Sequence, residues 1–126
     1  MIPKFRAWDK DHKYMEYTDR NLIVSFGDNG NVDATDLSNI YSTCNGMQNF
    51  ELMQSTGLKD KNGTEIYEGD IVKNIYDEIY VVKWFDAAFY LEEKYNGGFD
   101  YHELHFEDNK KVIGNIYENP ELLEDE

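Results

Sequence analysis

The sequence predicts a small, mainly β protein that folds without metal ions or disulfide bonds. Short segments rich in β-branched and aromatic residues, such as 71–76 and 78–85, alternate with turn-forming clusters of Gly, Asn and Asp. Aromatic residues make up 15% of the 126 residues, which is typical of folded chains and not of disordered ones. The length suits one compact domain or two small lobes, and it is sufficient to bury a core.

The first part of the chain predicts a β hairpin followed by a third strand. Residues 2–8 and 13–17 have strand character and flank a polar turn at 9–12. Residues 22–26, Leu-Ile-Val-Ser-Phe, form an apolar run of strand length. A strong turn follows at 28–31, because Asn-Gly tolerates positive φ.

Residues 33–49 carry the weakest pattern. Within them, 35–41 fit either one helical turn or a loop. Residues 50–55 alternate enough to predict a further strand.

Residues 56–73 contain the densest turn chemistry in the sequence. Asp60-Lys61-Asn62-Gly63 predicts one tight turn, and Glu68-Gly69-Asp70 predicts a second. Strands are expected at 71–76, 78–85 and 89–92, with short connections between them. A meander of such strands commonly closes into a small barrel, which removes exposed edges. The glycines here are therefore interpreted as folding devices and not as a catalytic loop.

The last part of the chain predicts a breaker, a strand and a helix start. Asn96-Gly97-Gly98 interrupts the strand pattern, and residues 99–106 are expected to form a short irregular or 3₁₀ segment. Residues 111–117 predict the final strand. Asn119-Pro120-Glu121 suits a helix N-terminus, although only one or two turns can follow. The expected organisation is a β-rich lobe at 1–56, a small barrel at 57–118 and a short acidic tail at 119–126.

The charge excludes some partners and favours others. The chain has 26 acidic and 12 basic side chains, a net charge of -14, and no Lys or Arg between residues 21 and 58. Nucleic-acid affinity comes largely from cations that displace phosphate counterions, so direct binding of DNA or RNA is disfavoured. No apolar run is long enough to span a bilayer, and the N-terminus lacks the hydrophobic region of a signal peptide. We therefore expect a cytoplasmic protein with no membrane partner.

Candidate reactive residues are few, and no cofactor is expected. The lone Cys44 has no activating base near it in the sequence and excludes an internal disulfide. Asp9, Asp11 and His12 share one turn and offer metal ligands, but a solvated hairpin tip is the simpler interpretation.

Two histidines near the end of the chain offer a second candidate metal site. His102 and His105 would share a face if their segment were helical, and would lie on opposite faces of a strand. A third ligand is not evident, so two surface histidines are the alternative interpretation. No catalytic residue is predicted.

Exposed aromatic residues offer a different candidate, a peptide groove. Tyr76, Tyr80, Trp84 and Tyr90 fall on or near the predicted strands. They either line such a groove on the barrel face or fill the core, and we expect about half of them in the core.

Three blocks of sequence together resemble one known family. They are residues 4–9 (Lys-Phe-Arg-Ala-Trp-Asp), residues 53–72 with Thr-Gly-Leu-Lys-Asp-Lys-Asn-Gly and Ile-Tyr-Glu-Gly-Asp-Ile-Val, and residues 112–122 with Val-Ile-Gly-Asn-Ile-Tyr-Glu-Asn-Pro-Glu-Leu. In this order they resemble the YopX-like proteins of phages and prophages. The stretches between the blocks are similar only in general character.

The resemblance implies an SH3-type β barrel, a phage or prophage origin in Gram-positive bacteria, and assembly into a homo-oligomer. It implies no activity, cofactor or catalytic residue. The family's signature falls on turns, strand starts and a helix cap, so it marks the fold and not a reaction. Its positions here are Gly57, Asp60, Asn62, Gly63, Gly69, Asp70, Gly114, Asn119 and Pro120.

Three functions remain open at this point. The leading hypothesis is a non-enzymatic accessory protein that self-associates and recognises an unidentified host or phage protein. The second is an acidic decoy whose carboxylates imitate the DNA backbone and occupy a host nucleic-acid-binding protein. The third is a metal-dependent enzyme built around His102 and His105.

Overall fold

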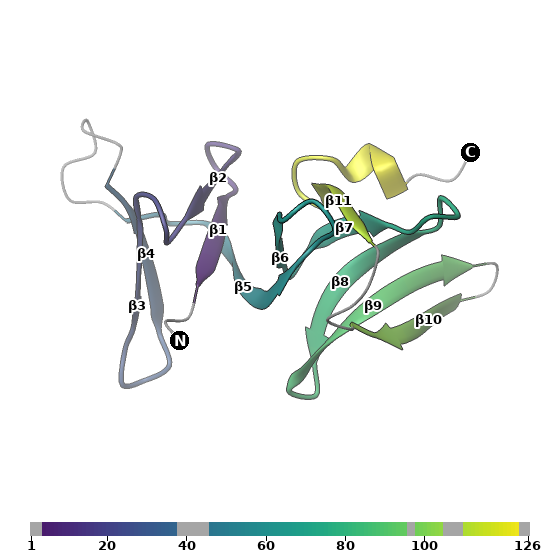
Figure 1. Ribbon diagram of the computed structural model, residues 1–126. Coiled ribbons are helices and arrows are strands. Elements are labelled where there is room, and N and C mark those ends of the chain that lie inside the picture. Colours follow the sequence, from purple (N-terminus) through teal and green to yellow (C-terminus); the bar gives the residue numbers. More distant parts are fainter. Residues whose placement is uncertain (1–3, 38–45, 96–97, 105–109, 124–126) are drawn as a thin grey trace. The chain divides into compact units, whose positions relative to one another are not determined.

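The computed structural model describes residues 4–37, 46–95, 98–104 and 110–123 (Figure 1). Within them the protein is mainly β, with strands and one short 3₁₀ helix. The chain divides into two compact units, Met1–Gln54 and Ser55–Glu126. The first contains β1 (Phe5–Asp9), β2 (Tyr14–Tyr17), β3 (Leu22–Phe26), β4 (Val32–Asp36) and the first half of β5 (Phe50–Lys59).

The first unit is built from three antiparallel pairings in two sheets. β1 lies between β2 and the start of β5, with Ala7 opposite both Glu16 and Leu52. This confirms the predicted hairpin. β3 and β4 form a second, two-stranded sheet with an unbroken register. The small core of this unit contains Ala7, Leu22 and Ala34, all buried.

Strand β4 corrects the sequence-based expectation for residues 35–41. Thr35 and Asp36 continue a strand that begins at Val32, so these two residues are not helical. The sequence Val-Asp-Ala-Thr-Asp has little intrinsic strand preference, and its pairing with β3 across the 27–31 turn supplies the structure. Residues 38–45, including Cys44, lie outside the described part of the chain.

The second unit contains the rest of β5 and a five-stranded antiparallel sheet ordered β10-β9-β8-β7-β11. The remaining elements of the second unit are β6 (Glu65–Tyr67), β7 (Asp70–Lys73), β8 (Ile79–Phe85), β9 (Ala88–Tyr95), β10 (Gly98–Glu103), β11 (Lys111–Asn115) and the 3₁₀ helix η1 (Pro120–Leu123). Figure 1 shows β8 and β9 curving strongly along their length, so the sheet curls like half of a barrel.

One face of this sheet covers the main core. The buried cluster consists of Ile66, Val72, Tyr80, Val82 and Leu91, with Phe89, Leu104 and Val112 packed against it. Tyr80 and Val82 alternate along β8, and Val82 lies opposite Leu91 of β9. Residues of the other parity on β8, including Lys83 and Phe85, therefore point to the opposite face.

Two predicted turns of the second unit are confirmed. Gly63 and Gly69 have φ angles of 84° and 87°, which L residues with side chains rarely adopt. Gly63 closes the turn between β5 and β6, and Gly69 reverses the chain between β6 and β7.

Other boundaries differ from the prediction. Residues 98–103 form a strand and not an irregular segment, because they pair with β9 in an unbroken register. β7 ends at Lys73, where a turn at Asn74–Glu78 begins. The predicted helix start at 119–121 is confirmed as the first turn of η1.

A candidate interaction surface

The family-signature residues form hydrogen bonds that join separate turns of the second unit. The carboxylate of Asp60 is 7% exposed and accepts N–H groups from Asn62 and Thr64, both 2.8 Å away, in its own turn. Its other oxygen accepts the N–H of Val112 in β11 at 2.9 Å. Burial alone would raise the pKa of this carboxyl, but the three N–H donors and nearby Lys111 together lower it below its usual value.

A second group of signature residues closes the chain after β11. The Asn119 side chain accepts the N–H of Asn115, and the Asn119 N–H donates to the Asn115 carbonyl. A Cβ atom on Gly114 would lie 2.5 Å from the Asn119 side-chain oxygen, so only glycine fits there. Pro120 then starts η1, where its missing N–H costs nothing.

The remaining signature residues fix the backbone around β6. Gly57 has a φ of 80° at the irregularity between β5 and β6. The buried Asp70 carboxylate accepts the Tyr67 N–H. The Gly69 N–H donates to the Val82 carbonyl, and the Gly69 carbonyl accepts the Ile116 N–H. All nine signature positions thus lie at turns, strand ends or strand irregularities, where their conformations and contacts fix the backbone.

The candidate metal residues do not assemble into a site in the described residues. Asp9 turns its carboxylate onto the N–H groups of Asp11 and His12 and onto the His12 ring, 3.1 Å away. His102 lies on β10, 3.2 Å from Glu93, and His105 is outside the described residues. In the described part of the chain, no three His, Cys, Asp or Glu side chains are arranged to hold a metal ion.

One half-buried tyrosine in the first unit, Tyr14, has a structural role. The Tyr14 hydroxyl donates to the Asp36 carboxylate at 2.7 Å and so joins β2 to β4. Burial and this hydrogen bond both raise the pKa of the phenol above its ordinary value. Tyr14 therefore stays neutral across the physiological range and acts as a fixed donor.

The strongest candidate for a functional surface is aromatic. Phe85, Tyr90, Phe99 and Tyr101 lie on the face of β8–β10 opposite the core, and we call them the aromatic surface. The Phe85 ring stacks on Tyr90 at 4.4 Å between centroids and meets Tyr101 edge-on at 5.1 Å. Phe99 and Tyr101 are 52% and 49% exposed. Rings held in contact with one another yet open to solvent suit a protein partner.

A hydrogen bond fixes one edge of the aromatic surface. The Tyr101 hydroxyl donates to Glu92 at 2.9 Å, and this bond raises the pKa of the phenol. Tyr101 lies directly opposite Glu92 in the β9–β10 pairing, so the bond holds its ring across the strand.

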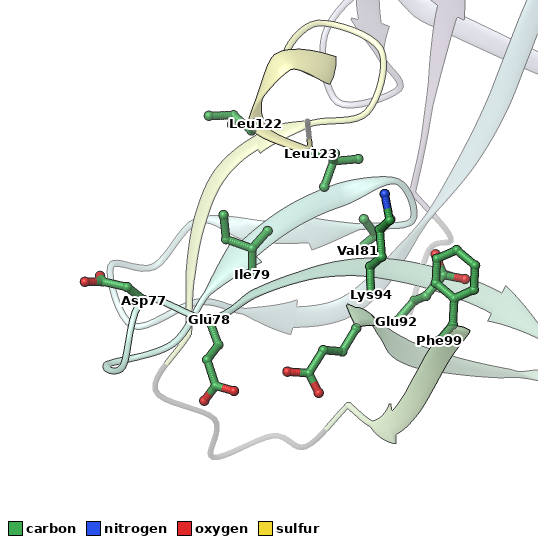
Figure 2. A pocket seen from close by; sticks show the side chains of 10 residues that line it. Asp77, Glu78, Ile79, Val81, Glu92, Lys94, Phe99, Leu122 and Leu123 are labelled. Carbon is green, nitrogen blue, oxygen red and sulfur yellow. The ribbon is translucent and has the colours of Figure 1, made fainter. Parts of the chain in front are cut away.

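Beside the aromatic surface lies a hollow of about 570 Å³. Figure 2 shows Ile79, Val81 and Lys94 on the side of the sheet that faces Leu123 of η1, whereas Glu78 points to the other side. Phe99 belongs both to the hollow and to the aromatic surface, so the two are continuous. The arrangement offers apolar contact area with a polar margin.

The predicted aromatic residues divide between core and surface. Tyr80 is buried in the core, whereas Tyr76 and Trp84 are exposed and Tyr90 belongs to the aromatic surface. The sequence interpretation missed Phe85, Phe99 and Tyr101 as surface residues. The alternation Phe99-Asp100-Tyr101 was the available signal, but the neighbouring glycines suggested an irregular segment.

The comparison with known protein families finds one matching family. The sequence model described as YopX protein matches residues 4–124. The chain belongs to the YopX family. The resemblance carried by the three sequence blocks is thereby confirmed.

Two solved structures are similar to this chain, and the first of them has the same fold. The crystal structure of protein yopX from Bacillus subtilis is 24% identical, covers 98% of this YopX-family chain and 100% of its own, and has a TM-score of 0.69. Protein EF1440 from Enterococcus faecalis is 32% identical over 98% of this chain and 99% of its own, with a TM-score of 0.48.

Two further findings complete the comparison. No curated protein sequence matches the chain significantly. Among the residues that the structure describes, no helix has the length or hydrophobicity needed to cross a membrane.

Proposed function

We propose that this YopX-family chain is a non-enzymatic interaction module, encoded by a phage or prophage, that self-associates and binds a host or phage protein. The observation that carries the proposal is the aromatic surface. Protein-binding surfaces are enriched in aromatic residues, and contiguous exposed apolar patches of this kind are uncommon on surfaces without a partner. The cytoplasm of a bacterial host is the proposed location.

The fold assignment belongs to the same proposal. The curled sheet of the second unit and the tight turns around β6 support an SH3-type barrel. Small barrels of this type use aromatic side chains on one face to bind extended peptides. Phe85 and Tyr90, stacked on adjacent strands, supply such side chains here.

Partner capture from a bacterial host tests the binding half of the proposal. The bait is the wild-type chain, compared with a Phe85→Ser/Phe99→Ser variant and with Phe26→Ser as the matched control. Phe26 is an exposed aromatic on β3 in the other unit. We expect a protein that the wild type and the control retain and that the double variant loses. Equal retention by all three baits would contradict the proposed surface.

The same experiment separates this function from the acidic decoy. A decoy would capture a nucleic-acid-binding protein that duplex DNA displaces, and the Phe85→Ser/Phe99→Ser variant would still bind it. Light scattering after size-exclusion chromatography tests self-association. A strict monomer at several hundred micromolar would contradict that half of the proposal.

A further inference from the structure

Strand β10 forms an outer edge of the five-stranded sheet. It pairs with β9, and no strand pairs with its other side in the part of the chain that the structure describes (Figure 1). Every residue from Phe99 to Glu103 is exposed. The outer side of an edge strand is a template for pairing with another strand.

The edge at β10 is less protected against such pairing than the opposite edge of the sheet. Natural edges are commonly blunted by bulges, prolines and charged side chains, lysine above all. The opposite edge, β11, begins with Lys111 and has a register irregularity between Val112 and Gly114. β10 contains no bulge, proline or lysine, and its six residues, Gly98 to Glu103, pair with β9 without interruption. Its acidic residues, Asp100 and Glu103, are its remaining protection.

We propose that the partner at this edge is a second copy of the chain, joined through antiparallel β10–β10 pairing centred on Tyr101. The proposal rests on the self-association proposed above and assigns its interface. A two-fold axis at Tyr101 places Tyr101 opposite itself, Phe99 opposite Glu103, and Asp100 opposite His102 on both sides of the axis.

Charge complementarity selects this register. Residues directly opposite in an antiparallel pair share a face, so each Asp100 carboxylate meets the His102 ring of the other copy. An imidazole donates to a carboxylate in either protonation state. A register centred on Asp100 would instead place two carboxylates against each other. His102 also contacts Glu93 at 3.2 Å on the same face, which places its ring beside the strand.

The pairing also makes use of the aromatic surface. Tyr101 rings of the two copies meet at the axis on the face opposite the core. Phe85 and Tyr90 lie on β8 and β9, on the inner side of the edge strand. Each dimer would therefore present two stacked aromatic pairs on one continuous sheet, suited to a partner with two binding segments.

Disulfide trapping tests the register directly. Opposed Cα atoms in antiparallel pairs lie about 4.5–5.5 Å apart, within the range that a disulfide bridges. In a Cys44→Ser background, oxidised Tyr101→Cys is expected to form a covalent dimer. Phe99→Cys is the matched control. Phe99 is equally exposed on the same strand and face, but in this register it lies opposite Glu103 and far from Phe99 of the other copy. Failure of Tyr101→Cys to crosslink, or equal crosslinking of Phe99→Cys, would overturn the register.

A charge exchange gives an independent readout. His102→Glu places two carboxylates opposite one another, and Asp100→Lys removes the carboxylate that accepts from His102 and replaces it with a second donor; each is expected to raise the dimer dissociation constant about tenfold. The double variant restores opposite charges and is expected to return within about threefold of the wild type. Sedimentation provides the constants, and circular dichroism verifies folding. A double variant weaker than either single variant would overturn the pairing.

The outcomes distinguish the two proposals. A wild type that associates while Tyr101→Cys stays uncrosslinked would refute the β10 interface and leave the proposed self-association standing through another surface. A wild type that is monomeric would refute both. Capture of a protein partner by the aromatic surface is measured separately.

Discussion

At the scale of single residues, the side chains that matter most to this fold are polar. The Asp60 carboxylate holds two N–H groups of its own turn and one of β11, 52 residues later in the chain. The two hydrogen bonds within the turn could be predicted from the sequence, because an Asp that begins an Asp-Lys-Asn-Gly turn commonly accepts N–H groups of that turn. The distant bond to Val112 could not be predicted, because it depends on how β11 meets the turn.

Replacing Asp60 with Asn is expected to lower the free energy of unfolding by about 2 kcal/mol. The amide removes the charge from hydrogen bonds that are largely buried, and such bonds contribute about 1.5–3 kcal/mol. Urea denaturation measures the change. Asp77→Asn is the control: its side chain is 83% exposed and pairs with Lys73 at 3.2 Å, so a change below about 0.5 kcal/mol is expected.

Asp60 also predicts part of the acid response. Its pKa in the folded protein is lowered below the ordinary 3.8, so the unfolded state binds the proton more readily. The stabilisation is present above pH 3.8 and is lost as the pH falls through the lowered pKa. Stability curves between about pH 6 and pH 2.5 should therefore fall less steeply for Asp60→Asn than for the wild type. Parallel curves would contradict this assignment.

Gly114 predicts a steric effect that a double-mutant cycle isolates. A Cβ added by Gly114→Ala would lie 2.9 Å from the Asn119 Cβ, a contact that side-chain rotation cannot relieve. We expect a loss of about 1–3 kcal/mol in unfolding free energy. In an Asn119→Gly background the same substitution should cost less than half as much, as measured by urea denaturation. An equal cost in both backgrounds would show that the contact is not responsible.

At the scale of elements, intrinsic propensity predicted some strands and missed others. Leu22–Phe26 and Ile79–Phe85 are rich in β-branched and aromatic residues, and both are strands as expected. β4 contains two Asp residues, and β10 contains Gly98 and Asp100; both residue types are depleted in strands. These strands exist because a well-formed neighbour offers a complete register, which is tertiary information. The aromatic surface was missed for the same reason, since half of it lies on β10.

The connection between β8 and β9 offers a stabilising substitution. Asp86 and Ala87 link the paired residues Phe85 and Ala88, and their φ angles are 49° and 61°. Such a two-residue turn favours glycine at its second position. Ala87→Gly is expected to raise the thermal midpoint and to stabilise the fold by about 0.5–1 kcal/mol.

The neighbouring alanine provides the matched control for that substitution. Ala88 is the first residue of β9, where glycine has no favourable φ to supply. Ala88→Gly is expected to destabilise the fold by about 0.5–1 kcal/mol. A loss of stability in both variants would show that the positive φ at residue 87 is not strained.

At the scale of the whole molecule, net charge and surface chemistry oppose each other. Each copy carries -14, which keeps copies apart at low ionic strength, whereas exposed aromatic rings and an open strand edge favour contact. The composition predicted the net charge and the aromatic content, but not the open edge, because the expected barrel would have removed exposed edges. It could not predict that the rings gather on one face of β8–β10, because that requires the strand register.

This opposition predicts how salt affects self-association. Long-range repulsion between two copies is screened beyond about 10 Å at 0.1 M salt, whereas strand pairing and ring contacts are short-range. Raising sodium chloride from 20 to 300 mM should therefore lower the dimer dissociation constant several-fold in sedimentation experiments, although the Asp100–His102 pairs weaken slightly. An uncharged osmolyte at equal osmolarity controls for changes in water activity. Dissociation by salt would instead mean that attraction between opposite charges drives assembly, and the apolar account of the interface would have to be abandoned.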